Sequence, residues 1–392
     1  MKRIMDEIKS NKIIKRPLNR KYYYLIRSGI LLLSKYKEKS VIEFIIENFK
    51  KRGNWEEFNV NNPQVKNPDF VYTDWAYKLD KNFLLNYRVN IRNSLDESLE
   101  NYSISNKYNL IENLKKTNIN KKHLLNQIYV NIYNIFKKYN YYMNIYENWF
   151  KRYKVLILKG IFSYSGLDIE VFTKFNDFKN FIDNLINDID IKNFDINKYN
   201  KLNGLNKKFR FNIEWVLQEY ITNPLLFEER KFHMRGIFFY NFSNNLKKGY
   251  LYDDLELLTS KLSYVNDDYK NKEIHDSHGK STIREFMTLK KDFKDIYGDE
   301  KVNYIFNQTK YIVQYIYKLI NATCYPEVKN CFNIYGFDIM ILDDFTVKII
   351  ENNCNPALKY PQEFFDLMFE KTIDYFLQPE NPQPKVNNYI EL

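Results

Sequence analysis

Two spacings of apolar residues divide the chain into helical and extended segments. Over residues 101–150 the apolar positions recur with a helical period, and Ser105 is expected to be the N-cap of the first helix. The period then changes, and the continuous apolar run 153–159 predicts a buried strand. Two further strands are predicted near Glu170 and over 214–221. The middle of the chain is therefore expected to place helices before a sheet.

Both ends of the chain combine predicted strands with helices. Residues 22–49 predict a strand followed by a helix, and short extended pieces come after them, so this end forms a small α/β unit. Toward the other end, strands are predicted over 230–242 and within 249–264, and a last helix over 361–378. The fold class expected from this order is mixed α/β (α+β).

The length of 392 residues allows two or three domains with one active cleft between them. A polar segment rich in Asn, Asp and Lys, with one helix over 177–189, is interpreted as a surface insertion at 176–210. The expected division is a basic extension at 1–20, an N-terminal α/β domain at 21–104, a central domain at 105–222 that contains the insertion, and a C-terminal domain at 223–392.

Residues 335–356 alternate and pair as a β-hairpin with a polar turn at 343–346. If the turn is centred between its two middle residues, Asp338 lies opposite Glu351, and Asn353 points to the same face as Glu351. Carboxylates so paired repel each other at about 5 Å between Cβ atoms. Two carboxylates and an amide oxygen are ligands suited to Mg²⁺ carried in with phosphates. The alternative is a solvated hairpin end, where such charges cost little.

The segment 230–240 carries three potential cations on alternate residues, Lys231, His233 and Arg235. They project to one face of a strand, and the apolar residues between them point to the other face. A row of cations beside a buried strand is costly unless an anion faces it. A wet sheet face is the alternative.

Two more positions have candidate chemistry. Lys159 ends a predicted strand before a turn containing Gly160 and Gly166, where a lysine can reach phosphate oxygens while backbone N–H groups approach them. Gln218 and Tyr220 lie where a strand runs into a loop that could bind the edge of an adenine. A surface lysine and an edge-strand glutamine are the alternatives.

Composition narrows the classes of partner. The chain holds 60 Lys plus Arg against 49 Asp plus Glu, a net charge of +11, which favours an acidic protein tail, a nucleotide or nucleic acid. Lys, Asn, Ile and Tyr are abundant together, as nucleotide bias in a coding sequence would produce, so the lysine count is weak evidence. Zinc-finger, basic-zipper and RNA-binding-sheet signatures are absent from the sequence, which makes nucleic acid the weaker alternative.

Three cysteines without zinc spacing predict reduced thiols and a cytoplasmic location. No stretch of the sequence approaches the roughly 18 apolar residues of a membrane helix, so no membrane partner is expected.

Two blocks of the sequence resemble the tubulin–tyrosine ligase family, a branch of the ATP-grasp ligases. The block QEYITNPLLFEERKFHMR, residues 218–235, is similar to the family's adenine hinge, Pro-Leu-Leu loop and Lys-Phe-Asp-hydrophobic-Arg strand. The hairpin at 335–356 resembles the family's Gly-Phe-Asp…Glu-x-Asn-x-x-Pro metal hairpin, with the same separation between Asp and Glu. The likeness runs from about Tyr22 to the C-terminus, interrupted by 176–210, and marks a divergent member.

The resemblance implies an ATP-grasp fold with the nucleotide in a cleft between two α/β domains, and it implies roles for single residues. Asp338, Glu351 and Asn353 would hold Mg²⁺ against the phosphates of ATP. Catalytic roles would fall to Arg235, Lys231 and Glu351. The implied nucleotide-binding residues are Lys107, Lys159, Gln218, Glu219, Tyr220, Ile221, Lys231, His233, Arg235 and His275.

The sequence also departs from the family pattern. His233 stands where the family has Asp, and 276–278 reads Asp-Ser-His where the family has Leu-Thr-Asn after its histidine. Asp168 occupies the place of a usual second glycine in the phosphate loop. Leu258 is interpreted as standing in place of a second catalytic arginine, with Lys261 the nearest substitute.

The function that the resemblance implies is an ATP- and Mg²⁺-dependent carboxylate–amine ligase. It would add a free amino acid (Tyr, Glu or Gly) to an acidic protein tail such as that of tubulin, through an acylphosphate, as a monomer. Two alternatives stay open: a catalytically degenerate relative that binds nucleotide or acidic tails, and a ligase that acts on another acceptor.

Overall fold

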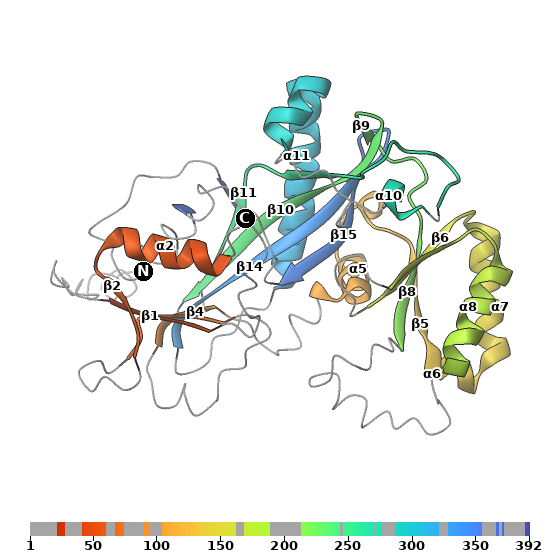
Figure 1. The fold of residues 1–392 in the computed structure, drawn as a ribbon, viewed down its shortest axis with the longest axis horizontal. Coiled ribbons are helices and arrows are strands. Elements are labelled where there is room, and N and C mark those ends of the chain that lie inside the picture. The colour runs from red at the N-terminus through yellow and green to blue at the C-terminus, as the bar shows by residue number, and fades with distance from the viewer. Residues whose placement is uncertain are drawn as a thin grey trace, which may run out of the picture.

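The fold is described from a computed structural model. It describes residues 22–27, 41–59, 67–73, 89–93, 104–161, 168–188, 213–243, 246–269, 271–275, 287–320, 328–354, 366–367, 371 and 389–392. Within these ranges the strands form two sheets, which Figure 1 shows side by side. The mixed α+β class expected from the sequence is confirmed.

The N-terminal strands continue the larger, twelve-stranded sheet. Its order is β13-β12-β10-β14-β4-β3-β1-β2, and β4 pairs parallel to β14. The elements of this end are β1 (Tyr22–Arg27), α2 (Val41–Arg52), β2 (Trp55–Glu57), β3 (Phe70–Thr73) and β4 (Val89–Asn93). Phe49 of α2 packs against Tyr24 and Phe70 at ring-centroid distances of 4.9 and 5.1 Å. This aromatic contact holds the helix on the sheet.

A four-stranded antiparallel sheet of order β5-β8-β6-β7 forms the central unit. Its face toward α7 and α8 buries Tyr146, Leu158, Phe178, Ile182 and Leu217. The elements are α5 (Lys107–Lys115), η1 (Lys121–His123), β5 (Gln127–Asn131), α6 (Ile132–Lys137), α7 (Tyr139–Arg152), β6 (Leu156–Gly160), β7 (Ile169–Phe172), α8 (Phe175–Asp188) and β8 (Glu214–Glu219). Because one face is packed on helices, polar residues of these strands gather on the other.

Two expectations for this unit need correction. The segment 101–150 is not helical throughout, because residues 127–131 form strand β5 and pair with β8. The strand-favouring residues Ile128, Tyr129 and Val130 find a partner strand there, which local spacing does not reveal. The first helix of this unit, α5, is capped by Asn106 instead of Ser105, since the Asn106 Oδ1 accepts the N–H of Tyr108 at 2.9 Å.

Helix α8 lies at the start of the segment that the sequence places in a surface insertion. Phe178 and Ile182 of this helix are nonetheless fully buried against the four-stranded sheet. The first part of the polar segment, as far as Asp188, therefore belongs to the core of the central unit. Residues 189–212 lie outside the described residues.

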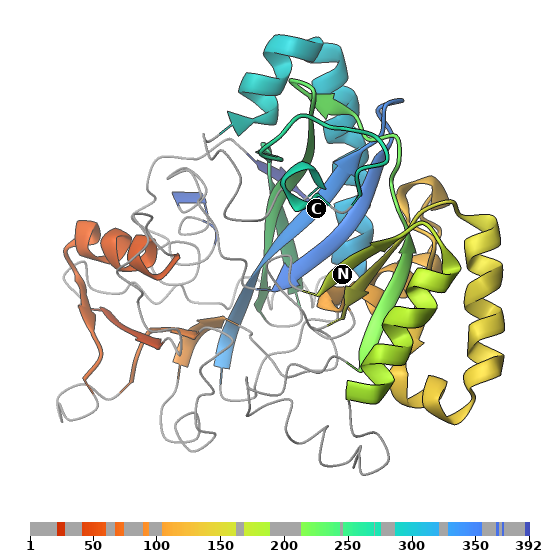
Figure 2. The ribbon, with the colours of Figure 1, turned by 45° about the vertical axis from the view of Figure 1, so that its right-hand side comes forward.

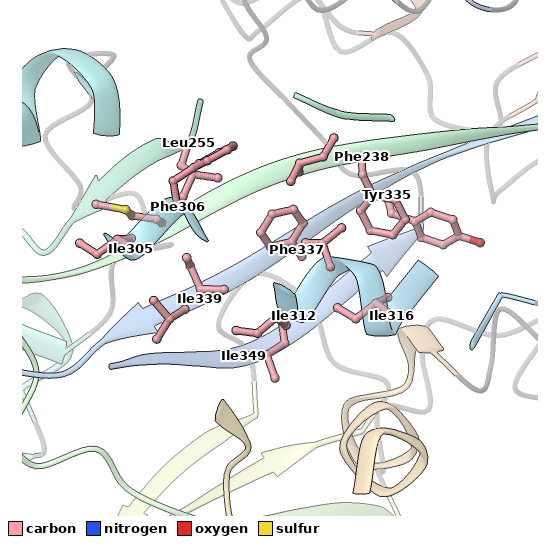
Figure 3. Close-up of a cluster of buried hydrophobic side chains, with 14 of the residues drawn as sticks. Phe238, Leu255, Ile305, Phe306, Ile312, Ile316, Tyr335, Phe337, Ile339 and Ile349 are labelled. Atoms are coloured by element: carbon pink, nitrogen blue, oxygen red, sulfur yellow. The ribbon is translucent and has the colours of Figure 1, made fainter. Parts of the chain in front are cut away.

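The C-terminal part of the large sheet packs one face on the long helix α11 (Lys294–Leu319). Figure 3 shows Ile312 and Ile316 of this helix pointing toward Phe337 and Ile339. Gly236 allows this packing, because a Cβ there would lie 2.2 Å from the ring of Phe337. The other elements are β9 (Leu226–Phe227), β10 (Arg230–Ser243), β11 (Leu246–Tyr252), β12 (Glu256–Thr259), α10 (Lys272–His275), β13 (Met287–Thr288), the π-turn η3 (Leu289–Phe293), β14 (Val328–Ile341), β15 (Val347–Cys354) and β16 (Tyr389–Glu391).

The hairpin β14–β15 has the pairing that the sequence predicts at its mouth, Asp338 opposite Glu351. Nearer the turn, however, Ile341 pairs with Val347 and Ile339 with Ile349. The turn is therefore centred on Asp344, half a residue earlier than predicted. A register shift between Asp338 and Ile339 adds one residue to β15 and restores the predicted pair.

Three further expectations have outcomes here. Cys331 in β14 is buried and disulfide-bonded, so the reduced state expected of all three cysteines is wrong for this residue. None of the described helices is long and apolar enough to cross a membrane. The last helix predicted from the sequence, 361–378, lies almost wholly outside the described residues.

Candidate functional site

Two polar sheet faces meet between the central unit and the C-terminal strands. On the large sheet, Phe232 and Met234 are buried toward α11, so Lys231, His233 and Arg235 share the opposite face, as the alternation predicted. On the small sheet, Lys159 alternates with the buried Leu158 and points away from the helices. Helix α5 lies between the small sheet and β15 (Figure 1; Figure 2 turns the view).

The carboxylates at the hairpin mouth are each compensated by a cation. Asp338 is 0% exposed, and its two oxygens accept the Nε–H and an Nη2–H of Arg235 at 2.7 and 2.8 Å. Glu351 lies 3.7 Å from the Nζ of Lys107, measured at Oε2. Its Oε1 accepts an N–H of Asn353 at 2.8 Å. The repulsion expected between facing carboxylates is thus offset by one cation from β10 and one from α5.

This donor set fits a magnesium ion. Mg²⁺ is commonly held by one or two carboxylates, with phosphates and water completing its octahedron. Asp338 and Glu351 supply two carboxylates, and Asn353 keeps its side-chain oxygen as an acceptor because its N–H groups face Glu351. Among the described residues, no three or more His, Cys, Asp or Glu side chains gather into a metal cluster.

Lys159 and Lys231 lie on the two polar sheet faces that meet here, and burial lowers the pKa of both. The pKa of Lys159 is lowered to about 8 by burial, partly opposed by Glu351, while Lys107 lowers it further. The pKa of Lys231 is lowered to about 7 by burial and by the charge of Lys159. These interactions show that Lys107, Lys159, Lys231 and Glu351, which come from four elements, share one electrostatic environment.

A chain of hydrogen bonds starts at Lys231 on β10. It passes through Tyr220, which is the first residue of the hinge after β8. The Lys231 Nζ donates to the Tyr220 hydroxyl at 2.6 Å and lies 4.2 Å from the centre of that ring. The Nε2 of His275 lies 2.8 Å from the carbonyl oxygen of Asp268, so Nε2 is the protonated nitrogen. The Nδ1 then accepts the Tyr220 O–H at 2.7 Å. The chain therefore runs from lysine through tyrosine to a neutral imidazole.

Burial supports this assignment of protons. The pKa of His275 is lowered to about 4 by burial and by the nearby Lys231. The pKa of Tyr220 is raised, first by burial and then by its tyrosine neighbours. A neutral imidazole and an un-ionised phenol leave Lys231 as the only member of this chain that titrates near neutral pH. Residues 276–278, which depart from the family pattern, lie outside the described residues.

The other expected adenine residues are held by a second polar network. The Nε2 of the buried Gln218 donates to Gln127 Oε1 at 2.8 Å, and Gln127 in turn donates to the Tyr108 carbonyl at 2.7 Å. Gln218 Oε1 is buried with no hydrogen-bond partner among the described residues. An orphaned acceptor on this face fits an adenine amino group, which is a donor.

Glu219 and Ile221 flank this network at the hinge. Both Glu219 oxygens accept from Asn126, the closer at 2.8 Å, and Oε1 lies 3.7 Å from the Nζ of Lys348. Glu219 thus links the hinge to the segment before β5 and to the β14–β15 hairpin, and Ile221 is buried beside it. The sequence did not identify Asn126, Gln127 or Lys348 as site residues. The only feature of the sequence that could have indicated Asn126 and Gln127 is their place as a polar pair just before an apolar run.

The structure gives the strand pairing of Leu258 and the ion-pair partner of Lys261, two residues at which the sequence departs from the family pattern. Leu258 pairs with His233, and the residue paired with Arg235 on β12 is Glu256. Two of the departures, Leu258 and His233, are therefore neighbours on paired strands, and the position beside Arg235 on β12 holds a carboxylate. Lys261 does not substitute there, since its Nζ pairs with Glu273 at 2.6 Å.

Asp168 lies at the end of the phosphate loop predicted from the sequence. It adopts a positive φ of 55°, and its carbonyl oxygen accepts the N–H of Gly160 at 3.0 Å. The left-handed backbone is the conformation that glycine adopts most readily, so the glycine usual in the family has a physical reason at this place. Gly166 lies outside the described residues.

Comparison with known proteins agrees with the sequence resemblance. The sequence profile described as "Tubulin-tyrosine ligase family" matches residues 86–388. A "Probable tubulin--tyrosine ligase PBY1" from Saccharomyces cerevisiae is 26% identical over 42% of this chain and 24% of its own length. Two Tetrahymena thermophila proteins, "Tubulin glycylase 3C" and "Tubulin glycylase 3D", are 27% and 24% identical over 38% and 41% of this chain. The matches span 15% and 17% of the two glycylases, so each relative is far longer than the shared region.

Proposed function

Because the chain belongs to the tubulin-tyrosine ligase family, we propose that it is an ATP- and Mg²⁺-dependent ligase that joins an amino acid to a protein carboxylate. The observation that carries this proposal is the convergence of Asp338 and Glu351 with the cations Lys107, Lys159 and Arg235. Paired carboxylates that face a set of cations suit a metal–polyphosphate complex, whose opposite charges need both.

The reaction consists of two displacements. An oxygen of the acceptor carboxylate attacks the γ-phosphorus of ATP, and the bond to the β–γ bridging oxygen breaks, so ADP leaves with that electron pair. The nitrogen of the amine then attacks the acylphosphate carbon, and phosphate leaves as the amide forms. Bound Mg²⁺ would neutralise phosphate charge. Both steps develop charge on phosphate oxygens, so positioning and charge neutralisation supply most of the catalysis.

The side chains of the chain divide these tasks. Lys107 and Lys159 face the metal carboxylates and would hold the polyphosphate beside them. Arg235 already holds Asp338 through two hydrogen bonds, which fixes its guanidinium where the transferring phosphoryl group would pass. Gln218 Oε1 and the hinge at 219–221 would receive the adenine. His233 lies on the same face of β10, between Lys231 and Arg235, with its side chain buried.

We propose an acidic protein tail as the acceptor, tubulin being the first to test, and action by a monomer in the cytoplasm. Two relatives are named as tubulin glycylases, so glycine is the first amino acid to try. A net charge of +11 would draw an acidic tail toward the protein.

The test is a ligation assay with tubulin, ATP, Mg²⁺ and labelled glycine, glutamate or tyrosine. We expect ATP-dependent incorporation of one of the three, with glycine the first candidate. No incorporation of any of them, while a known ligase modifies the same tubulin in parallel, would contradict tubulin as acceptor.

A catalytically degenerate protein that binds nucleotide is the second candidate. The observation that favours it is the pairing of Leu258 with His233: an apolar residue stands where the resemblance implies a second catalytic arginine, beside a histidine where the family has Asp. Calorimetry and the ligation assay together separate the two candidates: a ligase binds ATP with Mg²⁺ and forms product, whereas ATP binding without any ligation supports the degenerate protein.

Proton uptake on binding ATP tests the place of Lys231. With its pKa lowered to about 7, Lys231 is mostly neutral at pH 8 and mostly protonated at pH 6. A polyphosphate beside the amine raises this pKa, so binding at pH 8 should take up protons and binding at pH 6 should take up fewer. Titration calorimetry in two buffers that differ in ionisation enthalpy measures the difference.

Two variants complete that measurement. Lys231→Met should reduce the proton uptake at pH 8, and Lys261→Met should not, because Lys261 is an exposed lysine paired with Glu273. Equal uptake by Lys231→Met and the unmodified protein would show that another group titrates.

A further inference from the structure

Four charged residues form one row across the large sheet. Arg235 of β10 pairs with Glu256 of β12 on one side and with Asp338 of β14 on the other. Asp338 pairs in turn with Glu351 of β15. Paired residues on neighbouring antiparallel strands point to the same face, about 5 Å apart at Cβ. The row therefore reads carboxylate, guanidinium, carboxylate, carboxylate from one edge of the site to the other.

The direction of the Glu256 side chain follows from its neighbours. Leu255 and Leu257 are each 1% exposed and belong to the core beneath α11. Glu256 alternates with them and must point to the opposite face, toward the side chain of Arg235. Glu256 itself is partly exposed on that face.

The nearby acidic residues are used differently. Asp253 pairs with the Nζ of Lys290 at 2.5 Å. Asp254 accepts the backbone N–H groups of Leu255 and Lys290 at 2.8 and 3.0 Å. Within the run 253–256, Glu256 is therefore the carboxylate that shares a sheet face with Arg235.

The row places different chemistry at its two ends. The proposed metal carboxylates lie on one side of Arg235, and Glu256 lies on the other. The reacting carbonyl must lie near Arg235, since that residue faces the transferring phosphoryl group in the proposed reaction. A nucleophile that approaches from the side away from the metal would meet Glu256 first.

We propose that Glu256 binds the ammonium group of the amine substrate and so selects a cationic nucleophile. This inference rests on the ligase function proposed above. An ionised glutamate repels a carboxylate and donates no hydrogen bond, whereas it attracts an ammonium group. A charge-assisted hydrogen bond from the ammonium to Glu256 would orient the nitrogen beside Arg235.

The proton balance of the step is complete. The ammonium gives one proton to the Glu256 carboxylate, which frees the nitrogen lone pair for attack on the acylphosphate carbon. The carbon–oxygen bond to phosphate breaks with its electron pair, and the second nitrogen proton leaves with the phosphate. Glu256 then returns its proton to solvent.

Hydroxylamine separates the two half-reactions, because it is uncharged near neutral pH and traps acylphosphates as hydroxamates. The assay contains ATP, Mg²⁺, a glutamate-rich tail peptide and either hydroxylamine or the amino acid that the ligation assay identifies. For Glu256→Gln we expect hydroxamate formation within about twofold of the unmodified protein. The KM for the amino acid should rise by about 10- to 100-fold, the loss expected for a hydrogen bond to a charged group.

Two further variants sharpen the result. Glu256→Asp keeps the charge and should recover part of the lost affinity. Glu273→Gln removes an exposed carboxylate that pairs with Lys261 and should change neither readout. An unchanged KM in Glu256→Gln would overturn the inference, as would equal losses of hydroxamate and of ligation. If the unmodified protein forms neither product, the failure belongs to the proposed ligase function.

Discussion

Ligation by the Asp338→Asn variant is expected to fall by at least about 100-fold, the scale on which removal of one electrostatic contact to a reacting group acts. Asp338 is fully buried at the hairpin mouth and lies opposite Glu351, so its charge is half of the proposed metal-binding pair. Asparagine keeps one oxygen for the Nε–H of Arg235 and preserves the shape of the side chain. Because the variant also removes the counter-charge of Arg235, some stability should be lost as well, so turnover is compared at a temperature at which the variant is folded.

The measurement is initial rates of amino-acid incorporation over a range of Mg²⁺ concentrations, with circular dichroism to check the fold. Asp343→Asn is the matched control, because it removes a carboxylate from the exposed turn of the same hairpin, where Asp343 accepts from Asn223 at 2.8 Å. We expect its rates to match those of the unmodified protein. Turnover in Asp338→Asn within a few-fold of normal would show that this carboxylate binds no metal.

Arg235→Met should lower the free energy of unfolding by roughly 3 kcal/mol, because it leaves the charge of Asp338 buried without its bidentate partner. The Arg235 side chain is 16% exposed and that of Asp338 1%, so water can replace little of the lost interaction. The same variant removes the guanidinium proposed to stabilise the transferring phosphoryl group, so ligation should also be lost.

A double variant distinguishes the structural effect from the catalytic one. In Arg235→Met with Asp338→Asn, no uncompensated carboxylate remains, so most of the lost stability should return while ligation stays absent. Urea denaturation and the incorporation assay measure the two quantities separately. If the double variant is as unstable as the sum of the single ones, the pair does not account for the stability of this strand junction.

The sequence by itself determined the local geometry of the site. Alternation along 230–240 places Lys231, His233 and Arg235 on one face, because strand periodicity is a property of consecutive residues. The pairing of Asp338 with Glu351 was predicted from the hairpin turn alone. A bulge compensated for a turn that begins half a residue earlier than predicted, so the correct pair rested partly on a feature that local pattern does not show.

The tertiary structure decided which of these local elements are neighbours. Arg235 and Asp338 are 103 residues apart in the chain, and their contact depends on the antiparallel pairing of β10 with β14. Lys107 reaches Glu351 only because α5 packs on β15. Glu256 lies beside Arg235 because of the register between β12 and β10. Strand order and register come from packing a whole core, which periodicity within a segment does not encode, so the sequence specified the polar faces and the fold determined which charges meet.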